Sequence, residues 1–324
     1  MKASAVLRSL QVLLAARRAP FIWGPPGVGK SSVVRQLADL SQLALKDIRV
    51  LLHDPVDFKG LPHLSDGQTK WAIPDFLPRE GSGILFLDEL NAAPVLVQAA
   101  CYQLILDRKL GDYMLPDGWA VVAAGNRESD RSVATRMPTA LRNRFVHLDF
   151  EVDRIEWKEW AFTNSIRDEV ICFIDFREEL LHQFDRDANA FPSPRSWEFV
   201  SDILNGNPSP SIEHELIEGA VGKAAATEFV AFLHTFRNLP NIDALLLNPE
   251  TEPLPAKADG QYAVACALSR RASESNFDRV SRYLDRMPPE FGVLCVTDAI
   301  RRNPEVKHTA AFTRWATRNH DVLN

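Results

Sequence analysis

The chain has 324 residues, 46% of them hydrophobic and 25% charged, which allows about two domains with a sizeable core and excludes wholesale disorder. Its 37 basic and 43 acidic residues give a net charge of −6, which argues against a general nucleic-acid coat. Four widely separated cysteines without a C-x-x-C pair argue against structural zinc and a disulfide framework: Cys101, Cys172, Cys266 and Cys295.

The first half of the chain alternates helix and strand patterns. Apolar residues at helical spacing predict helices over residues 6–14 and 31–40. Strands are also predicted over residues 21–23, 48–52 and 145–150. Continuous apolar runs, typical of parallel strands covered on both faces, predict two further strands over residues 84–87 and 119–124. This alternation indicates an α/β domain with a parallel sheet, to which we assign residues 1–152.

The strand signal fades after residue 152. Helical patterns follow at residues 157–162, 169–184, 197–204 and 212–233, and we assign residues 153–238 to one helical domain. A loop rich in proline is expected at residues 249–260. Residues 239–324 form a helical C-terminal extension, with helical patches at residues 261–271, 277–284 and 310–318. No apolar run reaches the length of about 18 residues that a membrane helix needs, and no export signal opens the chain, so we expect a cytoplasmic protein.

The strongest motif is a phosphate-binding loop that follows the first predicted strand and opens a helix. It matches G-x-x-x-x-G-K-[ST], and with the serine after it comprises Gly24, Pro25, Pro26, Gly27, Val28, Gly29, Lys30, Ser31 and Ser32. Glycines let backbone N–H groups turn toward phosphates, and the helix N-terminus favours anions. Lys30 is expected to reach the β- and γ-phosphates, and Ser31 to ligate Mg²⁺.

Polar residues end two further strands. Asp88 and Glu89 follow the apolar run at residues 84–87, at the sheet edge where ligands bind. Asp88 is expected to hold Mg²⁺, directly or through water, and Glu89 to act as the base on the attacking water. Asn126 ends the strand at residues 119–124 and either helps Glu89 to position that water or simply forms a turn with Gly125.

Together these motifs resemble the AAA+ ATPases. The resemblance implies an α/β P-loop core followed by an all-α lid, which is the segment 153–238, and a sensor role for Asn126. It also implies that an arginine just before the fifth strand reaches the nucleotide of the neighbouring subunit. Arg144 is preferred for that role, Arg142 is the rival, and a surface salt bridge is the alternative for either. Arg195, at a Ser-Pro helix start, matches the lid arginine that senses the γ-phosphate.

Within these ATPases the chain is most similar to the MoxR branch, through residues 54–62 and 140–145. In that branch an insert at residues 54–78 faces the pore of a ring, and a second hairpin is expected at residues 108–117; surface loops are the alternative for both. Trp71, Phe76 and Trp119 are either pore contacts or packing anchors.

The resemblance implies an ATP hydrolase that uses ATP and Mg²⁺, assembles as a homo-oligomer of six subunits, and remodels or activates a protein partner. Relatives in the MoxR branch commonly act with a protein that carries a von Willebrand factor A domain. A nucleic-acid motor that grips DNA with Lys59, Lys70 and Lys109 is the main alternative, disfavoured by the acidic charge. A nucleotide-gated scaffold is a third, against which Glu89 argues. ATP is preferred over GTP by the family resemblance alone, since the P-loop reads phosphates.

Overall fold

The computed structural model describes residues 1–65, 67–127 and 137–323. The chain divides into two compact units, which we consider separately. The first comprises Met1–Trp160 and His182–Ser196; the second comprises Ala161–Leu181 and the residues from Trp197 onward. A parallel sheet flanked by helices forms the first unit and helices form the second, so the predicted fold class is confirmed. The placing of domain boundaries at residues 152 and 238 stays a prediction.

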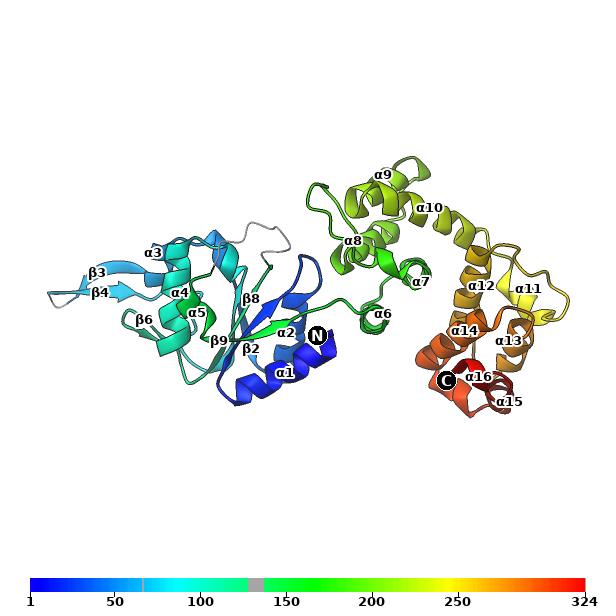
Figure 1. Cartoon of the computed structure of the whole chain (residues 1–324), viewed down its shortest axis with the longest axis horizontal. Coiled ribbons are helices and arrows are strands. Elements are labelled where there is room, and N and C mark those ends of the chain that lie inside the picture. The colour runs from blue at the N-terminus through cyan, green and yellow to red at the C-terminus, as the bar shows by residue number, and fades with distance from the viewer. Residues whose placement is uncertain (66, 128–136, 324) are drawn as a thin grey trace. The chain divides into compact units, whose positions relative to one another are not determined.

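The five-stranded sheet of the first unit has the strand order β2-β5-β8-β1-β9 (Figure 1). Its strands are β1 (Ala19–Trp23), β2 (Ala44–Arg49), β5 (Ser82–Asp88), β8 (Gly118–Gly125) and β9 (Phe145–Asp149). Every neighbouring pair is parallel; Phe21 of β1, for example, lies opposite Ala123 of β8 and His147 of β9. The carboxyl ends of all five strands therefore meet at one edge of the sheet.

Helices cover both faces of this sheet. Successive residues of a strand point to opposite faces, so their apolar side chains form two separate cores. Ile22 belongs to the core under α1 (Ala3–Ala15) and α2 (Lys30–Leu40), and Phe21 to the core under α4 (Val95–Asp107). Two further helices flank β9 in the chain, α5 (Thr139–Arg142) and α6 (Arg154–Thr163). The two cores hold the sheet rigid behind its carboxyl edge.

Two antiparallel hairpins interrupt the α/β alternation. The first insert consists of a short helix, α3 (Pro55–Lys59), and a hairpin of β3 (Leu61–Ser65) and β4 (Gln68–Ala72), which extends away from the sheet (Figure 1). The second hairpin consists of β6 (Lys109–Leu110) and β7 (Tyr113–Met114), as the pattern at residues 108–117 predicts. The Tyr113 hydroxyl donates to the carbonyl of Pro78 over 2.5 Å and ties the second hairpin to the end of the first insert.

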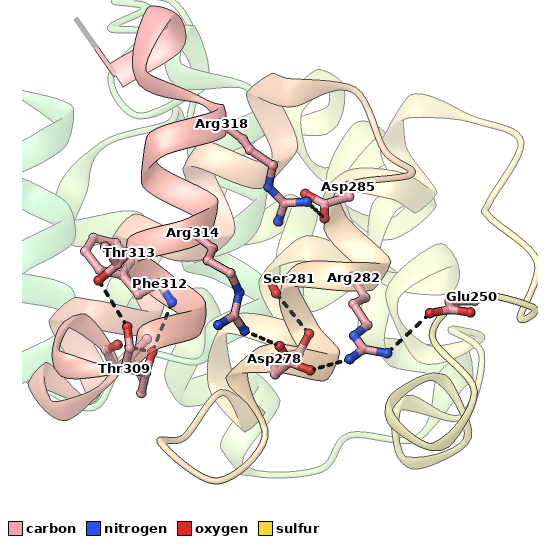
Figure 2. A network of polar contacts seen from close by, with 11 residues as sticks. Glu250, Asp278, Ser281, Arg282, Asp285, Thr309, Phe312, Thr313, Arg314 and Arg318 are labelled. Carbon is pink, nitrogen blue, oxygen red and sulfur yellow. Dashed lines mark hydrogen bonds and ion pairs between the residues drawn. The ribbon is translucent and has the colours of Figure 1, made fainter.

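The second unit is helical throughout its described residues. Its helices are α7 (Asp168–Phe176), α8 (Pro194–Asn205), α9 (Pro210–Val221), α10 (Lys223–Arg237), α11 (Ile242–Leu247), α12 (Ala258–Arg271), α13 (Phe277–Leu284), α14 (Pro289–Arg302), α15 (Ala310–Arg318) and α16 (His320–Leu323). Helices α11 to α15 share one apolar core, which includes Leu245, Val264 and Trp315. On its surface Asp278 of α13 accepts a hydrogen bond from Arg314 of α15 over 2.8 Å, which joins the two helices (Figure 2). Asp278 also pairs with Arg282 of its own helix at 2.9 Å.

Three of the predicted elements were wrong in detail. The strand expected at residues 48–52 begins earlier, as β2, and Val50–Leu52 forms a 3-10 turn, because the edge strand pairs with β5 through weakly apolar residues. The helix expected at residues 169–184 ends at Phe176, and the Leu180 carbonyl accepts a hydrogen bond from the buried Trp197 indole. The helix expected at residues 212–233 is two helices, separated at Gly222, whose φ of 81° favours glycine.

Candidate functional site

The loop between β1 and α2 has the shape of a phosphate cradle. Gly27 and Gly29 have φ values of 78° and 100°, which few other residues adopt. A Cβ atom on Gly27 would lie 2.7 Å from the Ser193 hydroxyl, whereas one on Gly29 would meet nothing within 4 Å. No side chain in the described part of the chain caps the N-terminus of α2, so its first N–H groups can face an anion.

The residues of this loop divide into backbone donors and shaping residues. Pro25 and Pro26 have no N–H group, so they can set the path of the loop but cannot donate to a phosphate. The Val28 side chain is buried in the core under α1 and α2, so only its backbone faces the loop. The backbone N–H groups from Gly27 to Ser31 are therefore the donors that the loop can offer.

The Lys30 ammonium group lies across the mouth of the loop. It donates to the carbonyls of Gly24 and Pro25 over 2.7 and 2.9 Å, and to Oδ1 of Asn126 over 2.8 Å. Three oxygen acceptors within hydrogen-bond distance satisfy the ammonium group in this arrangement. Phosphate oxygens are acceptors of the same kind with a negative charge, so they can compete for the same protons.

Ser31 and Asp88 meet at the same edge. The Ser31 hydroxyl donates to Oδ2 of Asp88 over 2.9 Å, and Oδ1 of Asp88 accepts the backbone N–H of Glu89, also over 2.9 Å. A hydroxyl and a carboxylate side by side fit Mg²⁺, a hard cation that usually takes one or two protein oxygens together with phosphate and water. Among the described residues no group of three or more His, Cys, Asp or Glu side chains is arranged to hold a metal ion.

Glu89 follows Asp88 in a left-handed backbone conformation. Its φ is 56° and ψ is 31°, and it precedes a 3-10 turn at Leu90–Ala92. A non-glycine residue with positive φ is uncommon and is found at functional sites more often than elsewhere. The half-buried Glu89 carboxylate makes no hydrogen bond or ion pair within the described residues, so it can accept a proton from a water molecule.

A buried asparagine supports Asn126 and was not predicted from the sequence. Nδ2 of Asn91, a residue only 2% exposed, donates to the Asn126 carbonyl over 2.7 Å. Gly125 is required beside it, since a Cβ atom there would lie 1.9 Å from Oδ1 of Asn91. Its role depends on these tertiary contacts, so the local sequence pattern does not identify Asn91.

Comparison with known proteins agrees with this geometry. Residues 20–145, from β1 to the start of β9, match the model of the AAA domain of the dynein-related subfamily. Residues 20–145 form an AAA domain. The P-loop, Asp88, Glu89 and Asn126 all lie within it. A search of the curated proteins found no match to the chain.

Solved structures also match the chain at low identity. A mutant of RuvB from Thermotoga maritima is 18% identical, with 77% of this chain and 82% of that chain covered and a TM-score of 0.42. NtrX from Brucella abortus in complex with ATP is 13% identical, with 98% and 68% covered and a TM-score of 0.44. These values carry no argument about substrate or partner.

The two candidate arginines before β9 lie away from the P-loop of the same AAA domain. Phe145, which follows Arg144, lies opposite Ala19, the first residue of β1, whereas the P-loop follows the last. A strand of this length separates its ends by about 13 Å. The exposed Arg144 side chain makes no hydrogen bond or ion pair within the described residues, and the Arg142 side chain there contacts only the Thr139 hydroxyl, over 3.4 Å. Neither arginine therefore forms a salt bridge with another residue in the described part of the chain.

Arg195 contacts the P-loop through its backbone. Its N–H donates to the Gly27 carbonyl over 3.2 Å, within the first unit, and α8 begins beside it at Pro194, as the Ser-Pro signal predicts. The Arg195 side chain is exposed and has no polar partner in the described chain. This backbone contact brings the start of α8 to the phosphate cradle.

The aromatic residues of the AAA domain divide between packing and exposure. The Trp119 indole donates to the Glu80 carbonyl over 2.9 Å and is 5% exposed, and Phe76 packs on Phe58, so both are packing anchors. Trp71, on β4 of the first hairpin, is 40% exposed. On the same hairpin Leu61 and Leu64 are 75% and 82% exposed, an unusual concentration of exposed apolar side chains.

Proposed function

We propose that the AAA domain binds ATP with Mg²⁺ and hydrolyses it. One observation carries this proposal: hydrogen bonds join Lys30 to Asn126 and Ser31 to Asp88 at one sheet edge, next to Glu89, whose carboxylate has no polar partner among the described residues. Each side chain has the chemistry that phosphoryl transfer to water requires, namely a phosphate-binding cation, oxygen ligands for a metal and a base. GTP shares the same phosphates, so the choice of ATP rests on the family alone.

In this proposal the residues take separate roles. Backbone N–H groups of the loop and Lys30 bind the phosphates, and Glu89 accepts a proton from the attacking water while Asn126 orients it. Ser31 and Asp88 would hold Mg²⁺, which supplies neutralisation of phosphate charge. Arg195 would contact the γ-phosphate from the helix start beside Gly27, as its backbone contact with that glycine supports.

We further propose that hydrolysis requires assembly, most simply as a hexameric ring. Arg142 and Arg144 lie at the turn just before the amino end of β9. They are therefore poorly placed to reach the P-loop of their own chain. An arginine supplied by a neighbouring subunit stabilises transition-state charge and contributes about 10³ to 10⁵ in rate. The isolated chain would then bind nucleotide but turn it over slowly.

The proposed work of the ring is remodelling or activation of a protein partner, in the manner of the MoxR branch. The hairpin of β3 and β4 supports this, because it presents Leu61, Leu64 and Trp71 to solvent, and such surfaces suit protein contacts. A protein that carries a von Willebrand factor A domain is the partner that the resemblance to that branch implies. Activity in the cytoplasm is part of the same proposal; no described helix is long and apolar enough to cross a membrane.

A hydrolysis-deficient variant tests the proposed function. Glu89→Gln is expected to bind ATP and hold the partner, so material recovered with it in ATP but not in ADP identifies the partner class. Glu215→Gln, at an exposed position of α9, is the matched control and should behave as wild type. Recovery of a protein without nuclease-sensitive material supports the remodelling role, and recovery of nucleic acid favours the motor instead.

A further inference from the structure

An imidazole connects the strand that carries the P-loop to the turn that carries the two arginines. Trp23 is the last residue of β1, and its indole N–H donates to Nδ1 of His147 over 2.8 Å. Nε2 of His147 lies 2.9 Å from the carbonyl of Arg142. His147 itself is on β9, opposite Phe21 of β1, so both contacts lie within the first unit.

The two partners fix the protonation state of this ring. The indole N–H of Trp23 can only donate, so Nδ1 of His147 must be an acceptor. The Arg142 carbonyl can only accept, so Nε2 must carry the proton. The contacts therefore select the neutral Nε2–H form, and a protonated ring would oppose an N–H group to the Trp23 indole.

Ring stacking holds the imidazole in this orientation. The His147 ring lies over Trp23 with an interplanar angle of 24° and a centroid distance of 5.9 Å. Phe21 lies 6.0 Å away and Phe145 6.4 Å away, both between ring centroids. Three aromatic neighbours restrict the ring, so its two hydrogen bonds transmit the position of one partner to the other.

We propose that His147 is a positioning residue, which fixes the turn bearing Arg142 and Arg144 relative to the strand that ends in the P-loop. The proposal rests on the proposed ATPase function. It predicts that His147 governs how an arginine is presented to the neighbouring subunit, and not how its own chain binds nucleotide. Misplacement of a catalytic group by about 1 Å can cost 100-fold in rate, so loss of both hydrogen bonds should lower hydrolysis by about 10- to 100-fold.

Few charged groups surround the ring. Its ring contacts with β1 are with Phe21 and Trp23, neither of which carries a charge. From the turn it meets Arg142, and along β9 the nearest acid on the same face is Asp149, whose carboxylate pairs with Arg127 at 2.9 Å. Hydrogen bonds and ring stacking, and not a neighbouring charge, therefore hold His147 in place.

Glutamine and leucine at this position separate positioning from packing. His147→Gln keeps one acceptor and one donor and should retain most of the hydrolysis. His147→Leu keeps the bulk and loses both hydrogen bonds, so it should hydrolyse slowly while its affinity for ATP is unchanged. Equal hydrolysis by the wild type and His147→Leu would overturn the proposal.

Mixed subunits test whether His147 acts on the neighbour. Glu89→Gln chains cannot hydrolyse but keep an intact arginine turn, so added to His147→Leu they should raise hydrolysis above the mean of the two separate samples. No increase, together with weakened ATP binding by His147→Leu, would show that the histidine serves its own P-loop and overturn the proposal.

A readout without hydrolysis keeps this inference distinct from the proposed function. The ¹⁵N-labelled chain should show an indole N–H resonance, assigned by its absence in Trp23→Phe, that moves in His147→Leu, where the acceptor is lost, and moves less in His147→Gln. The same resonance position in the wild type and in His147→Leu would overturn the link whatever the activity. A resonance that moves in His147→Leu, in a chain without any hydrolysis, would uphold the link and refute the ATPase proposal.

Discussion

Nζ of Lys30 lies 2.8 Å from Oδ1 of Asn126, so the P-loop lysine and the amide at the end of β8 are in contact before any nucleotide is considered. The lysine comes from the first turn of α2 and the amide from the neighbouring strand, 96 residues later. Phosphate oxygens that accept hydrogen bonds from the lysine in place of Asn126 would release the amide to another partner. The contact therefore offers a direct way for the strand end to respond to the γ-phosphate.

Replacement of Asn126 should affect turnover more than binding. Asn126→Ala removes an acceptor from Lys30, which keeps the Gly24 and Pro25 carbonyls as partners. We expect the rate of hydrolysis to fall by about 10²-fold, the size of a lost polar contact in a transition state, with ATP affinity changed less than threefold. Isothermal titration and a steady-state phosphate assay measure the two quantities; a loss of affinity equal to the loss of rate would contradict the sensor role.

Replacement of Ser31 should act through the metal. Ser31→Ala removes the hydroxyl that contacts Asp88, one of the two proposed oxygen ligands. We expect ATP affinity in the presence of Mg²⁺ to fall by about tenfold, the loss of one polar contact, whereas affinity in EDTA should be unchanged. Ser41→Ala, at the exposed C-terminal end of α2, is the matched control. Equal losses with and without Mg²⁺ would show that Ser31 does not serve the metal.

Gly27 should tolerate no side chain. Its φ of 78° disfavours a Cβ atom, and that atom would lie 2.7 Å from the Ser193 hydroxyl. Gly27→Ala should weaken ATP binding by at least about tenfold, since strain of about 1–2 kcal/mol falls on the cradle itself. Gly67→Ala carries a similar φ of 74° at the tip of the first hairpin with nothing within 4 Å, so it controls for backbone strain alone. Comparable binding by the two variants would argue against the close approach.

The ion pair of Arg167 and Glu169 should make the second unit sensitive to acid. Burial acts to raise the pKa of Glu169. The hydrogen bonds of 2.6 and 3.1 Å from Arg167, a backbone hydrogen bond and the charges of Arg167 and Arg270 together outweigh it, so the pKa lies below its ordinary value. A carboxyl group with a lowered pKa stabilises the fold above its unfolded pKa, and that stability is lost as the pH falls through the folded value.

Removal of the arginine tests this linkage. Arg167→Ala should lower the free energy of unfolding at pH 7 by about 1–3 kcal/mol, the cost of an unpaired buried group. The loss should be smaller at pH 3, below the ordinary pKa of a glutamate, because part of the stabilisation by the ion pair is already absent there. Arg271→Ala, whose exposed pair with Asp243 spans 3.5 Å, should cost below about 1 kcal/mol. Denaturant titrations at both pH values provide the comparison; the same loss at pH 3 and pH 7 would show that charge pairing is not the cause.

The sequence predicted the parts of the site that local chemistry determines. Gly24 to Ser31, Asp88 and Asn126 each end or follow an apolar run, and a parallel sheet brings such ends to one edge. The hydrogen bond between Ser31 and Asp88 follows from that arrangement. Asn91 was missed because its importance depends on burial against Gly125, which no local pattern reports.

Tertiary contacts account for the errors in the fold. Helix α7 ends at Phe176, and the Trp197 indole donates to the Leu180 carbonyl beyond it. A periodic apolar pattern does not reveal that hydrogen-bond partner. Helices α4, α11 and α14 were not predicted. Helix α4 is apolar on nearly every side, so it lacks the one-sided pattern by which an amphipathic helix is recognised.

Steady-state ATP hydrolysis by mixed subunits tests the central claim most directly. Glu89→Gln lacks the base. The double variant Arg142→Ala with Arg144→Ala lacks both arginines of the turn before β9. The account predicts that the wild type hydrolyses ATP, that each variant alone falls by at least about 10³-fold, and that a mixture of the two regains activity, because an intact base in one chain meets an intact arginine in the next. A wild type without hydrolysis, or a mixture no more active than its separate components, would contradict it.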